Sequence, residues 1–348
     1  MSSAARPAVR RPKSKEILMA HGSGGRDMHQ LVEGLIVPQL YNPLLAALED
    51  QALLEIQGVR LAFTTDSFVV DPLFFPGGDI GQLAVNGTVN DLAMGGARPL
   101  YLSLALILEE GFPLADLDRV LQSVRAAADA SGVQIVTGDT KVVHRNCADK
   151  LFVNTSGVGL VSEGVRITAA GAQPGDRVLL SGTLADHGMA VLSCREGFAF
   201  SSPILSDTAG LWPLVQAMLE AAPGAVHVLR DPTRGGLATT LNEIAARSRV
   251  GIRLQETAIP VQVPVQSACE LLGLDPLYVA NEGKLVAIVA PDAADALLAA
   301  LRRQPLGREA SMVGTVVAGP QGQVILETAV GGSRIVDMLS GDPLPRIC

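Results

Sequence analysis

The stretch Asp79-Ile-Gly-Gln-Leu-Ala-Val-Asn-Gly-Thr-Val-Asn-Asp-Leu-Ala-Met-Gly-Gly96 decides how the first half of the chain is organised. Asp79 is a good N-cap, so the sequence predicts a helix over residues 80–94. The pair Gly95-Gly96 would end this helix. An apolar run at 99–108 follows directly and predicts a strand.

Working outward, the same alternation continues in both directions. Apolar runs at 52–57 and 59–65 flank Gly58 and predict a hairpin. Further strands are expected at 133–137, 151–161, 177–180, 225–229, 251–254 and 284–290, and further helices at 28–40, 113–130, 208–221, 237–248, 265–272 and 292–302. This pattern predicts an α/β or α+β fold.

The small, turn-rich segment Ala169-Ala-Gly-Ala-Gln-Pro-Gly175 marks a domain boundary. We expect four parts: a disordered leader over 1–16, an N-terminal domain over 17–168, a C-terminal α/β domain over 169–334, and a flexible tail over 335–348. The leader is basic but lacks an apolar core segment, so it is not a secretory signal.

Composition narrows the class of protein. The chain has 348 residues, of which 48% are hydrophobic and only 3% aromatic, so its core should be aliphatic. A net charge of -8 argues against a nucleic-acid partner. No apolar run is long enough for a membrane span. Cysteines at 147, 194, 269 and 348 show no Cys-x-x-Cys spacing, which argues against a zinc or redox site and favours the cytoplasm.

Three apolar runs lead to aspartates, at Asp66, Asp139 and Asp231. Ligands often collect beyond strand ends, although a single aspartate there is usually a turn former or a cap. Asp91 lies inside the predicted helix beside Asn90, with apolar neighbours on both sides. A charge there is costly unless it is paired, so the alternative is a solvated helix face. Carboxylates that converge from separate elements suit Mg²⁺ when it also holds nucleotide phosphates.

Two glycine turns could cradle phosphate. Arg230-Asp-Pro-Thr-Arg-Gly-Gly236, which includes Gly235, precedes a predicted helix whose N-terminus favours an anion. His21-Gly-Ser-Gly-Gly25, which contains Gly22 and Gly24, could form a second cradle. Each turn alone is a weak signal, and no P-loop or dinucleotide-binding fingerprint is present.

Lys141, Glu282 and Cys348 are candidates for reactive groups. Lys141 follows Asp139 by two residues, and Glu282 lies in Ala280-Asn-Glu-Gly283, just before a predicted strand. A carboxylate in a tight apolar turn can act as a base, while the alternative for both residues is an exposed turn. Cys348 ends the proline-containing tail Gly341-Asp-Pro-Leu-Pro-Arg-Ile-Cys348, where a terminal thiol can be threaded into a narrow site or be incidental.

These motifs resemble a known superfamily. Thr64-Thr-Asp-Ser67, Val89-Asn-Asp-Leu-Ala-Met-Gly-Gly-Ala97 and Asp231-Pro-Thr-Arg-Gly-Gly236 are similar to the ATP-binding motifs of the aminoimidazole ribonucleotide synthetase superfamily. The ending Pro345-Arg-Ile-Cys348 is similar to that of its hydrogenase maturation branch, the HypE family. Thr137-Gly-Asp-Thr-Lys-Val-Val143 and Ala280-Asn-Glu-Gly283 also fit that branch. The likeness runs from His21 to Cys348.

The resemblance implies a two-domain α/β fold that forms a homodimer through its N-terminal domain. It also implies an ATP-dependent carbamoyl dehydratase, which turns a carbamoyl group on the terminal cysteine into a thiocyanate for the cyanide ligands of NiFe-hydrogenase. The partners implied are HypF, which supplies the carbamoyl group, and the HypC–HypD complex, which receives the cyano group.

On this resemblance Asp66, Asp91 and Asp231 would hold Mg²⁺ and ATP, with Asp139, Asn90 and the glycine turns beside the nucleotide. Lys141 would neutralise phosphate charge, Glu282 would take a proton, and Cys348 would carry the substrate. The alternatives are a selenophosphate synthetase, a small-molecule kinase or ligase of the same fold, and a non-enzymatic ATP-binding scaffold. The glycine turn at 21–25 has neither the cysteine nor the lysine that selenophosphate synthesis would use.

Overall fold

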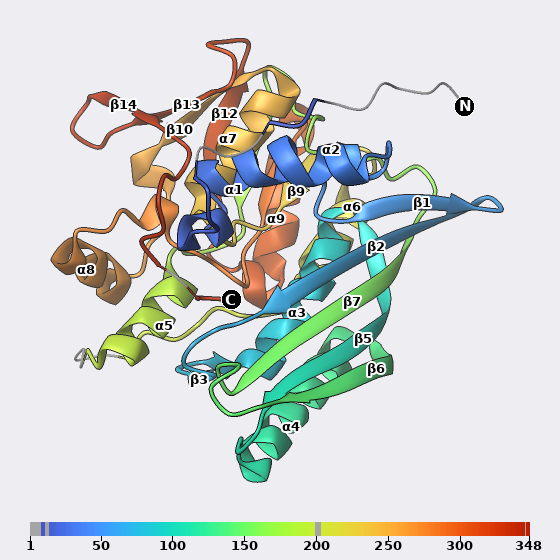
Figure 1. Cartoon of the computed structure of the whole chain (residues 1–348). Coiled ribbons are helices and arrows are strands. Elements are labelled where there is room, and N and C mark those ends of the chain that lie inside the picture. Colours follow the sequence, from blue (N-terminus) through green and yellow to red (C-terminus); the bar gives the residue numbers. More distant parts are fainter. Residues whose placement is uncertain (1–7, 11–13, 199–202, 345) are drawn as a thin grey trace.

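The computed structural model describes residues 8–10, 14–198, 203–344 and 346–348 (Figure 1). Its first half forms a five-stranded sheet in the order β1-β2-β7-β5-β6, in which only β5 and β6 are parallel. Helices α3 and α4 pack on one face, and the other face is open (Figure 1). The elements are α1 (Arg26–Leu31), α2 (Val37–Leu40), β1 (Ala52–Ile56), β2 (Val59–Phe68), β3 (Phe74–Phe75), β4 (Gly78–Asp79), α3 (Ile80–Met94), β5 (Ala97–Glu109), α4 (Leu114–Ser131), β6 (Gln134–Val143) and β7 (Leu151–Val161).

The second half forms a mixed sheet among the described residues, in the order β14-β13-β10-β12-β8-β11-β9. Its elements are β8 (Arg177–Leu180), α5 (Asp186–Glu196), α6 (Trp212–Ala221), β9 (Val226–Arg230), α7 (Gly236–Ser248), β10 (Gly251–Gln255), α8 (Val263–Leu272), β11 (Val286–Val289), α9 (Ala294–Arg303), β12 (Ser311–Val317), β13 (Gln323–Glu327) and β14 (Ser333–Val336). Among the described residues, no helix has the length and apolar character needed to cross a membrane.

Helix α3 lies where the two halves meet. It packs against β2, β7 and β5 on one side and also contacts α6 and β9 of the second half. Only Gln82 and Asp91 of this helix escape full burial. A helix that is buried all round needs apolar or small residues on every face. Asp79 caps it by accepting hydrogen bonds from the N–H groups of Gly81 and Gln82, as its sequence predicts.

The small residues of α3 let the sheet come close. A side chain at Gly87 would meet the ring of Phe68 at 2.9 Å, and the hydroxyls of Thr88 and Thr155 are hydrogen-bonded. Gly87 and Thr88, one helical turn before Asp91, therefore form a packing surface for β2 and β7. Its close contact with the sheet fixes where the Asp91 carboxylate lies.

Most predicted elements are present within a few residues, including the hairpin of β1 and β2, helix α3 and strand β7. Helix α5 and strands β12 to β14 were not predicted from the sequence. The sequence prediction also ended two strands too early, because β2 and β6 continue past their aspartates. Asp66 and Asp139 thus lie inside strands, and only Asp231 directly follows its strand.

The ends of the chain also differ from expectation. Residues 1–7 and 11–13 of the predicted leader lie outside the described residues, while Arg10 N–H donates to the carbonyl of Gly34 at 2.7 Å. The predicted flexible tail begins inside β14, which pairs with β13 through Ile335 and Val336. Farther along, Leu344 and Ile347 are buried against the core. These apolar contacts hold the tail against the body of the protein.

The turn Gly235-Gly236, before α7, has a strict steric requirement. Both residues have positive φ, of 77° and 60°. A side chain at Gly236 would meet the carbonyl oxygens of Leu277 and Val279 at 2.5 and 2.7 Å. Glycine is therefore required at 236 both for its backbone conformation and for the close approach of 277–279.

We predict that Gly236→Ala lowers the free energy of unfolding by roughly 3 kcal/mol, since strain from positive φ adds to overpacking. The matched control is Gly273→Ala, at the end of α8, where φ is also positive (67°) but nothing lies within 4 Å. It should cost only about 1 kcal/mol. Urea unfolding of both variants measures the difference, and equal losses would contradict the steric argument.

Candidate active site

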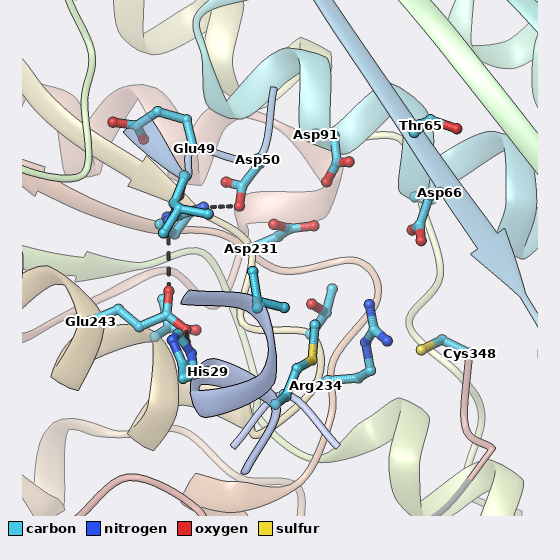
Figure 2. Close-up of a pocket in the computed structure, with 18 of the residues that line it drawn as sticks. His29, Glu49, Asp50, Thr65, Asp66, Asp91, Asp231, Arg234, Glu243 and Cys348 are labelled. Atoms are coloured by element: carbon cyan, nitrogen blue, oxygen red, sulfur yellow. Dashed lines mark hydrogen bonds and ion pairs between the residues drawn. The ribbon is translucent and has the colours of Figure 1, made fainter. Parts of the chain in front are cut away.

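A cavity of about 350 Å³ lies between the two halves of the chain. Its walls come from α1, β2, α3, the segment that follows β9, and the C-terminal residue (Figure 2). Figure 2 shows Asp66, Asp91 and Asp231 together along one side, with the sulfur of Cys348 nearby. Side chains far apart in sequence thus share one space.

The three aspartates come from different elements. Asp66 points inward from β2, and its Oδ1 accepts the N–H of Ser67 at 2.8 Å. Asp91 projects from α3, and its Oδ2 accepts the Thr64 hydroxyl at 2.7 Å. Asp231 directly follows β9. Among the described residues none of the three forms an ion pair with a lysine or arginine, so together they form an acidic wall.

Electrostatics at this wall disfavour three negative charges. Burial, followed by the charges of Asp231 and Asp66, holds the pKa of Asp91 well above its usual range. Burial also raises the pKa of Asp231 to about 6. The pKa of Asp66 is raised by burial too, although Arg234 opposes the shift. A cation placed here would relieve this repulsion and favour the ionised carboxylates.

These carboxylates fit Mg²⁺ only as part of a larger ligand set. Among the described residues, no group of three or more His, Cys, Asp or Glu is arranged to hold a metal ion by itself. Mg²⁺ is usually bound by one or two carboxylates together with substrate phosphates and waters. The acidic wall and its raised pKa values suit that mode of binding.

Glu282 lines the same cavity and is only 2% exposed. One of its carboxylate oxygens, Oε1, is buried without a hydrogen-bond partner. Burial is the main reason why its pKa is well above the usual range, and Asp231 and Asp207 add to the effect. A buried carboxylate with a free oxygen and a raised pKa has the properties of a general base.

Cys348 reaches the cavity at the end of the tail, beside Arg234 (Figure 2). Burial raises the pKa of its thiol to about 12, and Arg234 only partly offsets this shift. The docked thiol is therefore neutral and a poor nucleophile. A group already attached to the sulfur, in contrast, would be held next to the aspartates and Glu282.

The glycine turns have a steric role in the fold, beside the phosphate binding predicted for them. Gly24 lines the main cavity, whereas Gly22 and Gly235 line a second cavity beside the tail. A side chain at Gly24 would meet the Arg234 carbonyl at 2.6 Å, and one at Gly25 would meet the Leu339 carbonyl at 2.4 Å. These turns, with Gly236, let backbone segments approach closely and so place Arg234 in the cavity.

The structure corrects the prediction for Asn90. Its side chain is buried and points away from the cavity, toward the second half of the chain. Its Nδ2 donates to the carbonyls of Ala209 and Glu282 at 3.0 and 3.1 Å, and its Oδ1 accepts the N–H of Leu211 at 2.8 Å. Asn90 therefore holds the two halves together and fixes the main chain of Glu282.

The structure also corrects the placement of Asp139 and Lys141. In β6 they pair with Ala105 and Ile107 of β5, so they lie on the open face of the sheet. Both side chains are exposed, by 62% and 67%, and they form an ion pair of 2.7 Å. The sequence prediction ended this strand before Asp139. In the longer strand, side chains alternate between the two faces, and both residues point away from the cavity of their own chain.

Several cavity residues were not expected from the sequence. Arg230 forms ion pairs with Asp50 and Glu243, and His29 Nε2 lies 2.8 Å from Glu243 (Figure 2). The hydrogen bond to Glu243 raises the pKa of His29. Glu49 and Asp50 are two adjacent carboxylates just before the predicted hairpin, a pattern that could have indicated a binding site. Arg230 and His29 gave none, because their partners are distant in sequence.

Comparisons with known proteins place the chain in a family. Residues 48–161 match the family model "AIR synthase related protein, N-terminal domain", and 173–327 match the corresponding C-terminal domain. A protein named "Carbamoyl dehydratase HypE" from Azotobacter vinelandii is 56% identical over 336 residues, which cover 97% of this chain and 98% of that protein.

Two solved structures agree with this assignment. A HypE in complex with ATP has a TM-score of 0.81 and 50% identity, covering 96% of this chain and 100% of that chain. A HypE–HypF complex gives a TM-score of 0.85 and 47% identity, covering 89% and 99%. With near full-length likeness in sequence and in structure, this chain belongs to the HypE family of carbamoyl dehydratases, within the AIR synthase related proteins.

Proposed function

We propose that this chain dehydrates a carbamoyl group carried on the sulfur of Cys348, with ATP as the phosphate donor. One observation carries the proposal: the terminal thiol enters the same cavity as three aspartates, Arg234 and a buried glutamate. A relative named as a carbamoyl dehydratase supports it, and so does a hydrogenase maturation protein HypE that was solved in complex with ATP. The product is a thiocyanate, which supplies the cyanide ligands in NiFe-hydrogenase maturation.

The reaction balances in two steps. The carboxamide oxygen attacks the γ-phosphorus of ATP, which releases ADP and gives an iminophosphate while one N–H proton leaves. Loss of the remaining N–H proton then forms the C≡N bond as the C–O bond to phosphate breaks. The net change converts a thiocarbamate and ATP into a thiocyanate, ADP, phosphate and a proton. Phosphorylation is needed because a carboxamide oxygen is a poor leaving group.

Each residue of the cavity has a part in this scheme. Asp66, Asp91 and Asp231 would hold Mg²⁺, which screens phosphate charge when bound. Arg234 is close enough to the docked thiol for charge interaction, so it can stabilise negative charge that develops beside the sulfur. Glu282 takes the last N–H proton, since burial raises its pKa toward the range of a useful base.

The neutral thiol implies that carbamoylation occurs elsewhere. Because burial raises the pKa of the Cys348 thiol to about 12, the thiol is a poor nucleophile while it lies in the cavity. The tail must therefore leave to receive its carbamoyl group, and HypF is the proposed donor. A relative solved as a HypE–HypF complex supports that partner. The HypC–HypD complex is the proposed acceptor of the cyano group, and the cytoplasm is the proposed location.

The open face of the first sheet supports a homodimer. Phe63, Tyr101 and Ile107 lie there and are 43%, 48% and 42% exposed. Exposed large apolar side chains that share one face of a sheet favour an interface there. Asp139 and Lys141 share this face, so in the proposed dimer they belong to the interface.

We predict that Asp91→Asn and Asp231→Asn each weaken the affinity for Mg²⁺–ATP by at least about tenfold, because each removes a charge that faces the bound cation. Neither should lower stability much, since removing a charge also relieves repulsion. The matched control is Asp292→Asn, an exposed carboxylate in the second half. Calorimetric titration decides: native affinity in both cavity variants would refute the site.

We predict that Glu282→Gln still binds ATP and still accepts the carbamoyl group, but forms the nitrile about 10²- to 10⁴-fold more slowly. The two side chains are nearly isosteric, so mainly the base is lost. Intact mass spectrometry with HypF, carbamoyl phosphate and Mg²⁺–ATP follows the adduct on Cys348. A native rate of water loss would assign proton removal to another residue.

We predict that Ile107→Asp shifts the protein from dimer to monomer in analytical ultracentrifugation, because it puts a charge within the apolar face. The control Leu114→Asp changes an exposed leucine of α4, on the opposite side of the sheet, and should leave the dimer intact. A dimer that survives Ile107→Asp would place the interface elsewhere.

A further inference from the structure

The last residues of the chain are held through their main chain. The N–H of Asp71 donates to the carbonyl of Arg346 at 3.2 Å, and the N–H of Val69 donates to a Cys348 oxygen at 3.0 Å. Contacts at alternate residues are typical of a peptide added beside an extended segment. The body of the protein thus contains a binding site for a C-terminal peptide.

His187, on α5, contacts Ile347, the tail residue between Arg346 and Cys348. Its side chain is fully buried, and its Nε2 lies 2.9 Å from the carbonyl oxygen of Ile347. A carbonyl can only accept, so the proton must sit on Nε2. Nδ1 lies 2.8 Å from the Ser206 hydroxyl, which then donates to it. Burial lowers the pKa of His187, which keeps the ring in this neutral form.

The ring has little freedom to move. Phe75 packs edge-on against it, with the ring centroids 5.4 Å apart. The Ser206 hydroxyl is itself positioned, because it accepts the N–H of Thr208 at 3.2 Å. His187 is thus oriented from the first half of the chain and from the loop before α6, and it offers one fixed donor to the tail.

Arg195, also on α5, reinforces the same contact. Its Nη2 donates to the carbonyls of Asp71 and Arg346, at 2.7 and 2.8 Å. It therefore bridges the tail and the segment against which the tail lies. With His187, it connects α5 to consecutive carbonyls of the tail, those of Arg346 and Ile347.

We propose that His187, oriented by Ser206, is a positioning residue that latches the tail and sets how far the Cys348 thiol reaches into the cavity. It contacts a main-chain carbonyl next to Cys348 and is absent from the lining of the ATP cavity. It therefore acts on the reaction through the position of the sulfur. The inference rests on the proposed function only in that Cys348 is the group to be positioned.

The strength of such a latch suits a tail that must also leave. A hydrogen bond between neutral groups contributes modestly, while a buried donor left unpaired is costly. Loss of the latch should therefore shift the tail toward its undocked state without unfolding the protein. Leu344 and Ile347 remain as apolar anchors, so the shift should be partial.

The test measures how fast each cysteine of the full-length chain reacts with iodoacetamide, resolved by peptide mass mapping. The other cysteines are internal standards: Cys147 and Cys194 are exposed and set the upper limit, and buried Cys269 sets the lower limit. We expect His187→Ala to accelerate alkylation of Cys348 at least about tenfold and to leave Cys269 protected. His187→Gln should restore most of the protection, since an amide N–H can donate to the same carbonyl.

A matched control is His144→Ala, which removes a histidine that is 95% exposed and should change nothing. An unchanged Cys348 rate in His187→Ala, with Cys269 still protected, would overturn the proposal. If Cys269 becomes reactive, the fold has been lost and Ser206→Ala decides instead. That variant should accelerate Cys348 alkylation by a smaller factor, and a parental rate would overturn the latch.

The alkylation assay contains neither nucleotide nor carbamoyl donor, so it is independent of whether the proposed dehydration is correct. Under turnover, the latch also predicts a slower dehydration of carbamoylated Cys348 in His187→Ala with unchanged affinity for Mg²⁺–ATP. Faster alkylation without any dehydratase activity in the parent chain would retain the latch and refute the proposed function.

Discussion

Burial of helix α3 between the two halves of the chain is the constraint on which the site depends. Asn90 and Asp91 are neighbours on this helix but point in different directions. Asn90 uses its whole amide to hold the second half, including the main chain of Glu282. Asp91 faces the cavity. A small movement of this helix would thus displace an aspartate of the acidic wall and the proposed base together.

The cavity contains more carboxylates than positively charged side chains, so a bound cation would balance its charge. Asp66, Asp91 and Asp231 repel one another, and burial adds to the cost. Such an arrangement persists because the surrounding packing over-determines it, as is common at functional sites. The binding of a cation with a nucleotide would relieve the repulsion, which couples occupation of the site to its electrostatic stability.

The tail adds a substrate that is part of the chain. Its anchors are one extended segment, two side chains of α5 and two apolar residues, each a modest contribution. This balance permits docking without making it permanent. Because burial raises the pKa of the thiol, docking disfavours the thiolate form, which is the reactive nucleophile.

The sequence by itself determined the local elements and the chemical types of the main groups. Asp79 predicted the start of α3 and Gly95-Gly96 predicted its end. The cysteine at 348, with the aspartates and glycine turns, indicated ATP chemistry on a thiol. The turn of Glu282 left a base and an exposed residue both open, and the resemblance to the HypE family favoured the base. These signals are local, so they can be read from neighbours along the chain.

Only the tertiary structure decided which of these residues meet. Asp66 and Asp139 look alike in sequence, yet strand alternation and pairing place Asp66 in the cavity and Asp139 on the open face. Asn90 and Asp91 likewise point in different directions, because one residue along a helix turns the side chain by about 100°. His187 carried no sequence signal, because its partners, Ser206 and Ile347, approach it only when α5 and the tail pack together. Side-chain direction and long-range packing are properties of the folded chain, and no local pattern encodes them.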